Sequence, residues 1–152
     1  MRRALALAQE AAQDGEVPVG CVIVRDGKIL SEGRNRREGE KNALAHAEIE
    51  AIGAACRALG GWRLTGCTLY VTLEPCPMCA GAIINARIPC VVIGAKDARA
   101  GAMGSVLNVN SYPLNHRTAV EYGLLGEECA SVLRDFFRAR RKKNPAAVKP
   151  ES

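Results

Sequence analysis

Residues 67–94 read CTLYVTLEPCPMCAGAIINARIPCVVIG. Residues 67–73 are rich in β-branched side chains, residues 77–86 have helical periodicity, and residues 89–94 form a continuous apolar run. A strand, a helix and a second strand in this order form a parallel pair of strands with a right-handed crossover. This segment therefore predicts an α/β protein.

The flanking segments extend this unit. Two short apolar runs, residues 19–24 and 29–31, are joined by Asp26-Gly27, a dipeptide typical of a tight hairpin, so they predict antiparallel strands. An edge strand is expected at residues 118–122, and a long loop at 95–117. Helices are expected at residues 2–14, 43–59 and 126–143, the last with its inward face formed by Cys129, Val132, Leu133, Phe136 and Phe137.

The length of 152 residues fits one domain, which we place at residues 1–143, followed by a basic, disordered tail at 144–152. The hydrophobic fraction of 48% with 24% charged residues is typical of a globular protein. The net charge of +5 arises entirely from residues 134–152, because the basic and acidic residues before them balance. Basic runs attract phosphate backbones, although many are only solvated faces.

The cysteine pattern indicates a reducing compartment. Seven cysteines is an odd number, and only Cys76 and Cys79 have a regular spacing, so a disulfide scaffold is not expected. The apolar run at residues 4–8 is too short for a signal peptide, and no stretch approaches the ~20 apolar residues of a membrane span. We therefore expect a cytoplasmic protein without membrane association.

Cys76 and Cys79 have the two-residue spacing that lets both thiolates of a turn opening a helix face one metal ion. With His46 as a third donor, the ligands are those that zinc prefers in a tetrahedral site. A structural zinc needs a fourth protein ligand, and the other cysteines fall in predicted strands and helices without ligand spacing. We expect one zinc ion per chain, with its fourth position left to water.

Glu48 gives this metal site a specific chemistry. It follows His46 by two residues, and at the first turn of a helix both side chains can reach a ligand beyond the N-terminus. Pro77 suits the first turn of the helix after Cys76, so two positive helix N-termini are expected to face the metal. Zinc lowers the pKa of a bound water to about 7. In a hydrolytic deamination, Glu48 would take a proton from that water, protonate the ring nitrogen and then protonate the leaving amine.

Each half of the motif is weak alone, because a lone Cys-x-x-Cys can be a redox pair or half of a structural site. Together, with a proline before the first cysteine and about 30 residues between the halves, they match the signature of the zinc deaminases. At these residues the chain resembles the cytidine deaminase-like superfamily and, within it, the bacterial tRNA-specific adenosine deaminases. The matching motifs are Glu16-Val17-Pro18-Val19-Gly20, Gly33-Arg34-Asn35-Arg36, Ala45-His46-Ala47-Glu48, residues 69–76, Met78-Cys79-Ala80-Gly81-Ala82, Asn115-His116-Arg117 and Asp135-Phe136-Phe137-Arg138.

This resemblance implies a three-layer α/β/α cytidine deaminase-like fold with a mixed five-stranded sheet. It also implies a homodimer that converts the wobble adenosine of a tRNA anticodon stem-loop to inosine. The roles that it implies are a hydrogen bond from Asn35 to the flipped base, a base pocket lined by Val19 and the Ala47 backbone, a ribose contact for Asp97, and contacts of Phe137 and Arg138 with neighbouring nucleotides. The residue types alone also allow Val19 and Phe137 to be core residues and Asn35 to serve a turn.

Two other functions are compatible with these residues. A deaminase of a free nucleobase or nucleoside, of the guanine or cytosine type, would use the same zinc centre but would not need a basic C-terminal helix. A zinc-stabilised RNA-binding module without turnover would need neither Glu48 nor an open coordination position.

Overall fold

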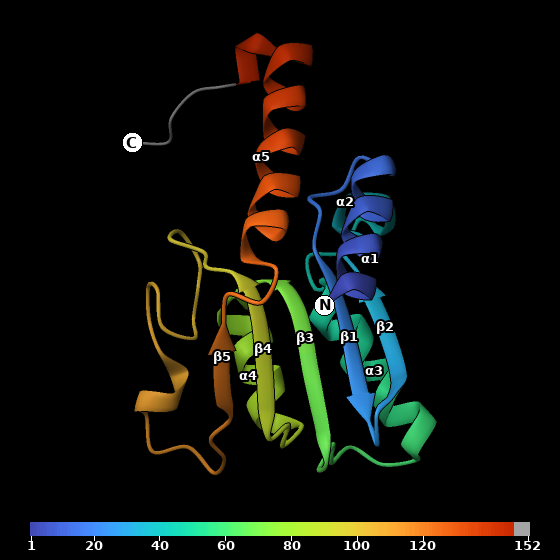
Figure 1. The fold of residues 1–152 in the computed structure, drawn as a ribbon, viewed down its shortest axis with the longest axis vertical. Helices are drawn as coiled ribbons and strands as arrows, with labels where there is room; N and C mark the ends of the chain where they lie inside the picture. The colour runs from blue at the N-terminus through green and yellow to red at the C-terminus, as the bar shows by residue number, and fades with distance from the viewer. Residues whose placement is uncertain (148–152) are drawn as a thin grey trace.

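The structure is a computed structural model that describes residues 1–147, and a mixed five-stranded sheet lies at its centre (Figure 1). The strands lie side by side in the order β2-β1-β3-β4-β5. β1 is antiparallel to β2 and β3, whereas β3, β4 and β5 are parallel, so the predicted hairpin and the predicted parallel pair are confirmed. The strand bounds are Gly20–Arg25 for β1, Lys28–Arg34 for β2, Cys67–Leu73 for β3, Cys90–Ala95 for β4 and Ala119–Tyr122 for β5.

Helices cover both faces of the sheet, as the predicted α/β/α layering requires. α1 (Arg2–Gln13) and α5 (Gly126–Lys143) lie on one face, and α3 (Ala47–Leu59) and α4 (Pro77–Asn85) lie on the other (Figure 1). Side chains alternate along β1, so that Cys21 and Ile23 join the larger core beneath α3 and α4 while Val22 packs with α1. None of the helices of residues 1–147 combines the length and the hydrophobicity that a membrane crossing requires.

Two glycines let helices lie directly on the sheet. A Cβ atom on Gly20 would overlap the carbonyl oxygen of Ala4 in α1, and one on Gly33 would overlap the carbonyl oxygen of Ala47. Because Ala47 is the first residue of α3, the contact at Gly33 fixes the start of that helix against β2.

On the N-terminal half, one predicted helix boundary was wrong and one short helix was missed. The helix expected from residue 43 begins at Ala47, because the Asn42 side chain accepts the N–H of Leu44 at 2.9 Å and holds a turn there. The polar stretch after β2 contains a short unpredicted helix, α2 (Arg37–Glu40). The Glu16 carboxylate stabilises it by accepting the N–H groups of Glu38 and Gly39, a contact between distant segments that local periodicity does not reveal.

The predicted inward face of α5 was also partly wrong. Cys129 is buried, but Phe137 is 38% exposed, because the second half of α5 extends past the edge of the sheet and has no core to face (Figure 1). The first four residues of the predicted disordered tail are described by the structure: Asn144 is the C-cap of α5, and Pro145–Ala147 form a 3₁₀ turn. Residues 148–152 of that prediction lie outside the described residues.

The predicted long loop between β4 and β5 contains one short 3₁₀ turn, η1 (Val109–Ser111), and an isolated antiparallel bridge between Met103 and Asn108. The loop begins after Ala95, at the carboxyl end of β4. Because β3 and β4 are parallel, β3 ends at the same edge of the sheet. This edge, flanked by the start of α3 and the start of α4, carries the candidate site.

Candidate active site

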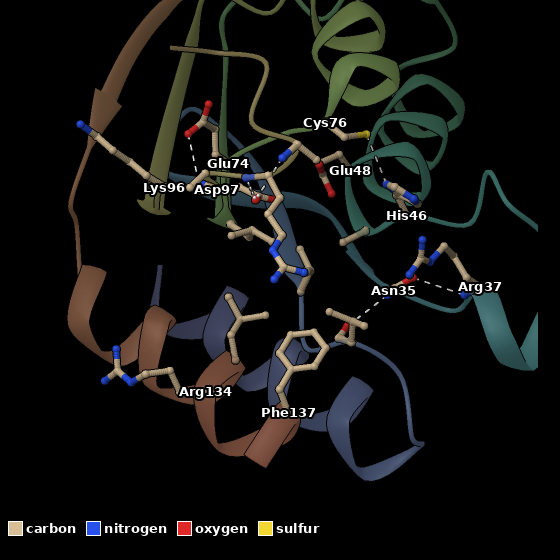
Figure 2. A pocket seen from close by; sticks show the side chains of 18 of the residues that line it. Asn35, Arg37, His46, Glu48, Glu74, Cys76, Lys96, Asp97, Arg134 and Phe137 are labelled. Carbon is tan, nitrogen blue, oxygen red and sulfur yellow. Dashed lines mark hydrogen bonds between the residues drawn. The ribbon is translucent and has the colours of Figure 1, made fainter. Parts of the chain in front are cut away.

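Two helix N-termini converge on one point, as the sequence predicted. His46 is the N-cap residue of α3, and Cys76 is the N-cap residue of α4 (Figure 2). Glu48 lies in the first turn of α3, and Cys79 lies in the first turn of α4. The positive ends of both helices therefore face the same cluster, where they favour thiolates and other anions.

The three predicted metal ligands are within reach of one ion. His46 Nδ1 lies 3.6 Å from Cys76 Sγ and 3.4 Å from Cys79 Sγ, and the three ligand atoms all lie within 4.8 Å of one another. A Zn–S bond of about 2.3 Å and a Zn–N bond of about 2.0 Å at a tetrahedral angle place nitrogen and sulfur roughly 3.5 Å apart. The donor types and their separation thus fit a tetrahedral zinc ion.

The ionisation of the two thiols is strongly linked. The hydrogen bond with Cys79 lowers the pKa of the Cys76 thiol to about 4, against the effect of burial and with further help from His46. The same hydrogen bond with Cys76, together with burial, raises the pKa of Cys79 far above that of a free thiol. The hydrogen bond with Cys76 also raises the pKa of His46. A bound cation is what would let both sulfur atoms be thiolates at once.

Glu48 is 4% exposed, and burial raises the pKa of its carboxyl group. A carboxyl group whose pKa is raised toward neutrality can both accept and return a proton during one reaction. The structure therefore places a suitable proton carrier beside the predicted metal site.

A cavity of about 710 Å³ opens above His46, Glu48 and Cys76. Cys79 is fully buried below it and does not reach its wall. All six predicted substrate-binding residues lie on that wall: Val19, Asn35, Ala47, Asp97, Phe137 and Arg138. The structure thus brings together residues that are spread over most of the chain (Figure 2).

The amide of Asn35 also serves the turn that its position suggested. Its Nδ2 donates to the carbonyl oxygen of Val17 at 3.2 Å, and its Oδ1 accepts the N–H of Arg37 at 3.3 Å. These bonds hold the side chain in a fixed orientation at the cavity wall. The turn interpretation and the site interpretation are therefore compatible.

A tRNA-specific adenosine deaminase of Bacillus subtilis (strain 168) is 49% identical to this chain over 150 residues, which is 98% of this chain and 93% of that protein. The family model described as MafB19-like deaminase matches residues 1–141. The chain belongs to the tRNA-specific adenosine deaminase family.

Two solved structures are similar in fold to this member of the tRNA-specific adenosine deaminase family. One comes from studies of A-to-I editing by tRNA:A34 deaminases at the wobble position of transfer RNA; it has a TM-score of 0.85 and 45% identity, and the match covers 88% of this chain and 97% of that chain. A guanine deaminase from Bacillus subtilis has a TM-score of 0.62 and 34% identity, and the match covers 99% of this chain and 94% of that chain. The fold and the enzyme class of the tRNA-specific adenosine deaminases are thus those of this chain.

Several residues of the site were not predicted from the sequence. Arg134 and Arg141 belong to the basic run at residues 134–152, which was located without being assigned to the site. Arg37, Lys96 and Arg99 lie in segments that also contain acidic residues, so no local excess of charge marks them. The acidic Glu74 stands directly before Pro75-Cys76, and its position was a usable signal. Hydrogen bonds from Ser105, Asp97 and Met103 outweigh the effect of burial and lower the pKa of Glu74. The unpredicted charged residues of the wall are Arg37, Glu74, Lys96, Arg99, Arg134 and Arg141.

Proposed function

We propose that this chain catalyses the zinc-dependent hydrolytic deamination of adenosine to inosine at the wobble position of tRNA anticodons. The observation that carries this proposal is the position of Glu48, buried at the floor of a 710 Å³ cavity beside the His46, Cys76 and Cys79 cluster. Membership of the tRNA-specific adenosine deaminase family directs that chemistry to adenosine in tRNA.

His46, Cys76 and Cys79 would hold the zinc ion, which when bound supplies a Lewis acid that activates water near neutral pH. Glu48 accepts one proton of that water and delivers it to the ring nitrogen of the base. It then accepts the second proton, from the hydroxyl group that the ring has gained, and passes it to the leaving amine. Val19, Ala47 and Asn35 line the same cavity as these groups, so they would enclose the base and keep its amine toward Glu48. Water adds to the ring and ammonia leaves, which balances the conversion of adenosine to inosine.

The wall of the cavity is suited to the phosphates of an RNA loop. Its basic residues come from α2, from the loop after β4 and from α5, so positive charge surrounds the opening on several sides. Charge of this kind attracts a phosphate backbone and holds it in register. A free base carries no phosphate, so this positive charge would not strengthen its binding. The basic residues that line the cavity are Arg37, Lys96, Arg99, Arg134, Arg138 and Arg141.

The substrate is tested by incubating the zinc-loaded protein with an anticodon stem-loop that has adenosine at the wobble position, followed by nucleoside digestion and mass spectrometry. We expect inosine at that position and none in a matched stem-loop with guanosine there. Deamination of free guanine or cytosine, with the stem-loop left unchanged, would instead support the free-base function. RNA binding without any product would support a binding module.

The double substitution Arg138→Ala and Arg141→Ala is expected to weaken stem-loop binding and to flatten its salt dependence, while zinc stays bound. Each lost phosphate contact reduces the slope of log K against log salt by about 0.7 to 0.9, so a reduction of about 1.5 is expected. Titrations at several salt concentrations measure it. Arg25→Ala with Lys28→Ala removes the same charge at the opposite end of the β1–β2 hairpin and serves as the matched control. Equal slopes for the two double variants would place the phosphate contacts elsewhere.

The proposal includes a homodimer. The loop before β5 presents several large apolar side chains to solvent, and such exposed groups are typical of a protein interface. They are Val106, Leu107, Tyr112 and Leu114. A dimer predicts a solution mass of twice 16.2 kDa, and a stable monomer in light scattering would contradict it.

We also propose a cytoplasmic location. None of the seven cysteines, all of them among the described residues, forms a disulfide, and reduced cysteines persist in a reducing compartment. The tRNA substrate of the proposed reaction is present there as well. Fractionation of cells that express the protein would test this, and recovery from an oxidising compartment would oppose it.

A further inference from the structure

Glu74, the residue directly after β3, is a buried carboxylate at 2% exposure. Within residues 1–147 no lysine, arginine or histidine forms an ion pair with it. A buried carboxylate is costly unless its oxygens are hydrogen-bonded. The hydrogen-bond donors around the Glu74 carboxylate therefore indicate its role.

All the groups that donate hydrogen bonds to the Glu74 carboxylate belong to one loop. Its Oε1 accepts the N–H of Asp97 at 3.2 Å and the hydroxyl of Ser105, and its Oε2 accepts the N–H groups of Met103 and Ser105 at 3.1 Å each. A Cβ atom on Gly101 would overlap this carboxylate, so the loop wraps closely around it. Residues 97–105 are thus folded around the single side chain of Glu74, which follows the neighbouring strand β3.

The same loop carries part of the cavity wall. Asp97, Arg99 and their neighbours line the cavity, and the Asp97 carboxylate accepts the N–H of Arg99 at 2.9 Å (Figure 2). A second tie joins the loop to the metal-ligand segment, because the N–H of Ala102 donates to the carbonyl oxygen of Pro75 at 2.9 Å. Pro75 is followed by the ligand Cys76. One short segment, residues 74–76, therefore connects the wall to the metal cluster.

We propose that Glu74 is a positioning residue for deamination: its carboxylate holds the wall segment 97–100 at a fixed place relative to Cys76, and so aligns the substrate with the metal cluster. The expected effect on turnover rests on the proposed function. The claim that Glu74 holds residues 97–105 in place does not, and it can be tested without measuring activity.

The four donors require a carboxylate. A glutamine in either orientation turns an NH₂ group toward a backbone N–H, that of Asp97 in one case and those of Met103 and Ser105 in the other. Two donors that face each other cannot bond, so part of the loop must move away. The side chain keeps its size, so the Glu74→Gln substitution removes the acceptor and the charge without leaving a cavity.

The test compares Glu74→Gln with Glu121→Gln, a change of the same chemistry at an exposed carboxylate on β5. Hydrogen exchange is measured along the chain, zinc content by metal analysis, and kcat and KM with the anticodon stem-loop. We expect faster exchange confined to residues 97–105, zinc still at one per chain, and kcat/KM lowered at least tenfold with both constants affected. Glu121→Gln should match the wild type in all three measurements.

Unchanged exchange in residues 97–105 would overturn the proposal, and so would loss of zinc in proportion to activity, which would limit Glu74 to metal retention. Ser105→Ala removes a single donor outside the cavity wall and should give the same loop-confined change at smaller size; it keeps the test decisive if Glu74→Gln does not fold. If the wild-type protein makes no inosine, the proposed function fails. Hydrogen exchange in residues 97–105 of Glu74→Gln still shows whether Glu74 holds the loop in place.

Discussion

The Glu48→Gln variant is expected to form inosine more slowly than the wild type by a factor on the order of 10⁴, the upper end of what a positioned acid–base group contributes. Two protons pass through this one carboxyl group: one goes from water to the ring nitrogen, and the other goes from the added hydroxyl group to the leaving amine. An amide of the same size performs neither. Because Glu48 is not one of the three ligand residues of the cluster, the variant should keep its zinc.

Single-turnover reactions with excess protein measure this effect, because they report the chemical step without product release. Glu40→Gln, at an exposed carboxylate of α2 that does not line the cavity, is the matched control and should react at the wild-type rate. A Glu48→Gln rate within tenfold of the wild type, with full zinc content, would show that another group carries the proton.

The chemical residues could be predicted from the sequence because their signal is local. Cys76 and Cys79 have a fixed spacing, and His46 and Glu48 follow a polar break where a helix can begin. Each pair needs only its own helix turn to be oriented correctly. The sequence does not show how close the two helix turns come to each other. In the structure, His46 Nδ1 lies 3.6 Å from Cys76 Sγ and 3.4 Å from Cys79 Sγ.

Two of the errors of prediction share a physical cause, because each depends on contacts between distant segments. α2 forms where the Glu16 carboxylate accepts two of its N–H groups, and no helical periodicity marks it. Phe137 has the spacing of a core residue, but α5 passes beyond the sheet at that point, so the ring lines the cavity instead. Amphipathic spacing identifies a helix face and does not say what that face meets.

Half of the basic residues on the cavity wall could not be found from the sequence, for a related reason. Arg37 and Arg99 lie in a short helix and a loop, and their charges are cancelled by acidic residues when the body of the chain is counted as a whole. Net charge therefore located the basic end of α5 and missed the cations that the fold gathers opposite it. Local field depends on which side chains face the cavity, and only the tertiary structure settles that.

Replacement of a metal ligand, in Cys79→Ala, is expected to remove zinc and to reduce inosine formation to background, a loss of more than 10³-fold. Two protein donors remain, and a zinc site with an open position for water ordinarily has three. Cys79 is fully buried beneath the cavity and does not reach its wall, so it makes no direct contact with a base there. Loss of activity in this variant therefore reports the metal.

Metal content after dialysis and thermal unfolding with and without added zinc measure this prediction. A metal that binds the folded chain raises its unfolding temperature, so the wild type should respond to zinc and to its removal by a chelator, whereas Cys79→Ala should not. Cys90→Ala removes a half-buried thiol of β4 outside the cluster and should behave as the wild type does. If Cys79→Ala keeps stoichiometric zinc, the ligand set is wrong. If it loses zinc yet makes inosine at the wild-type rate, deamination does not depend on the metal, and the roles assigned to the converging N-termini of α3 and α4 fail together.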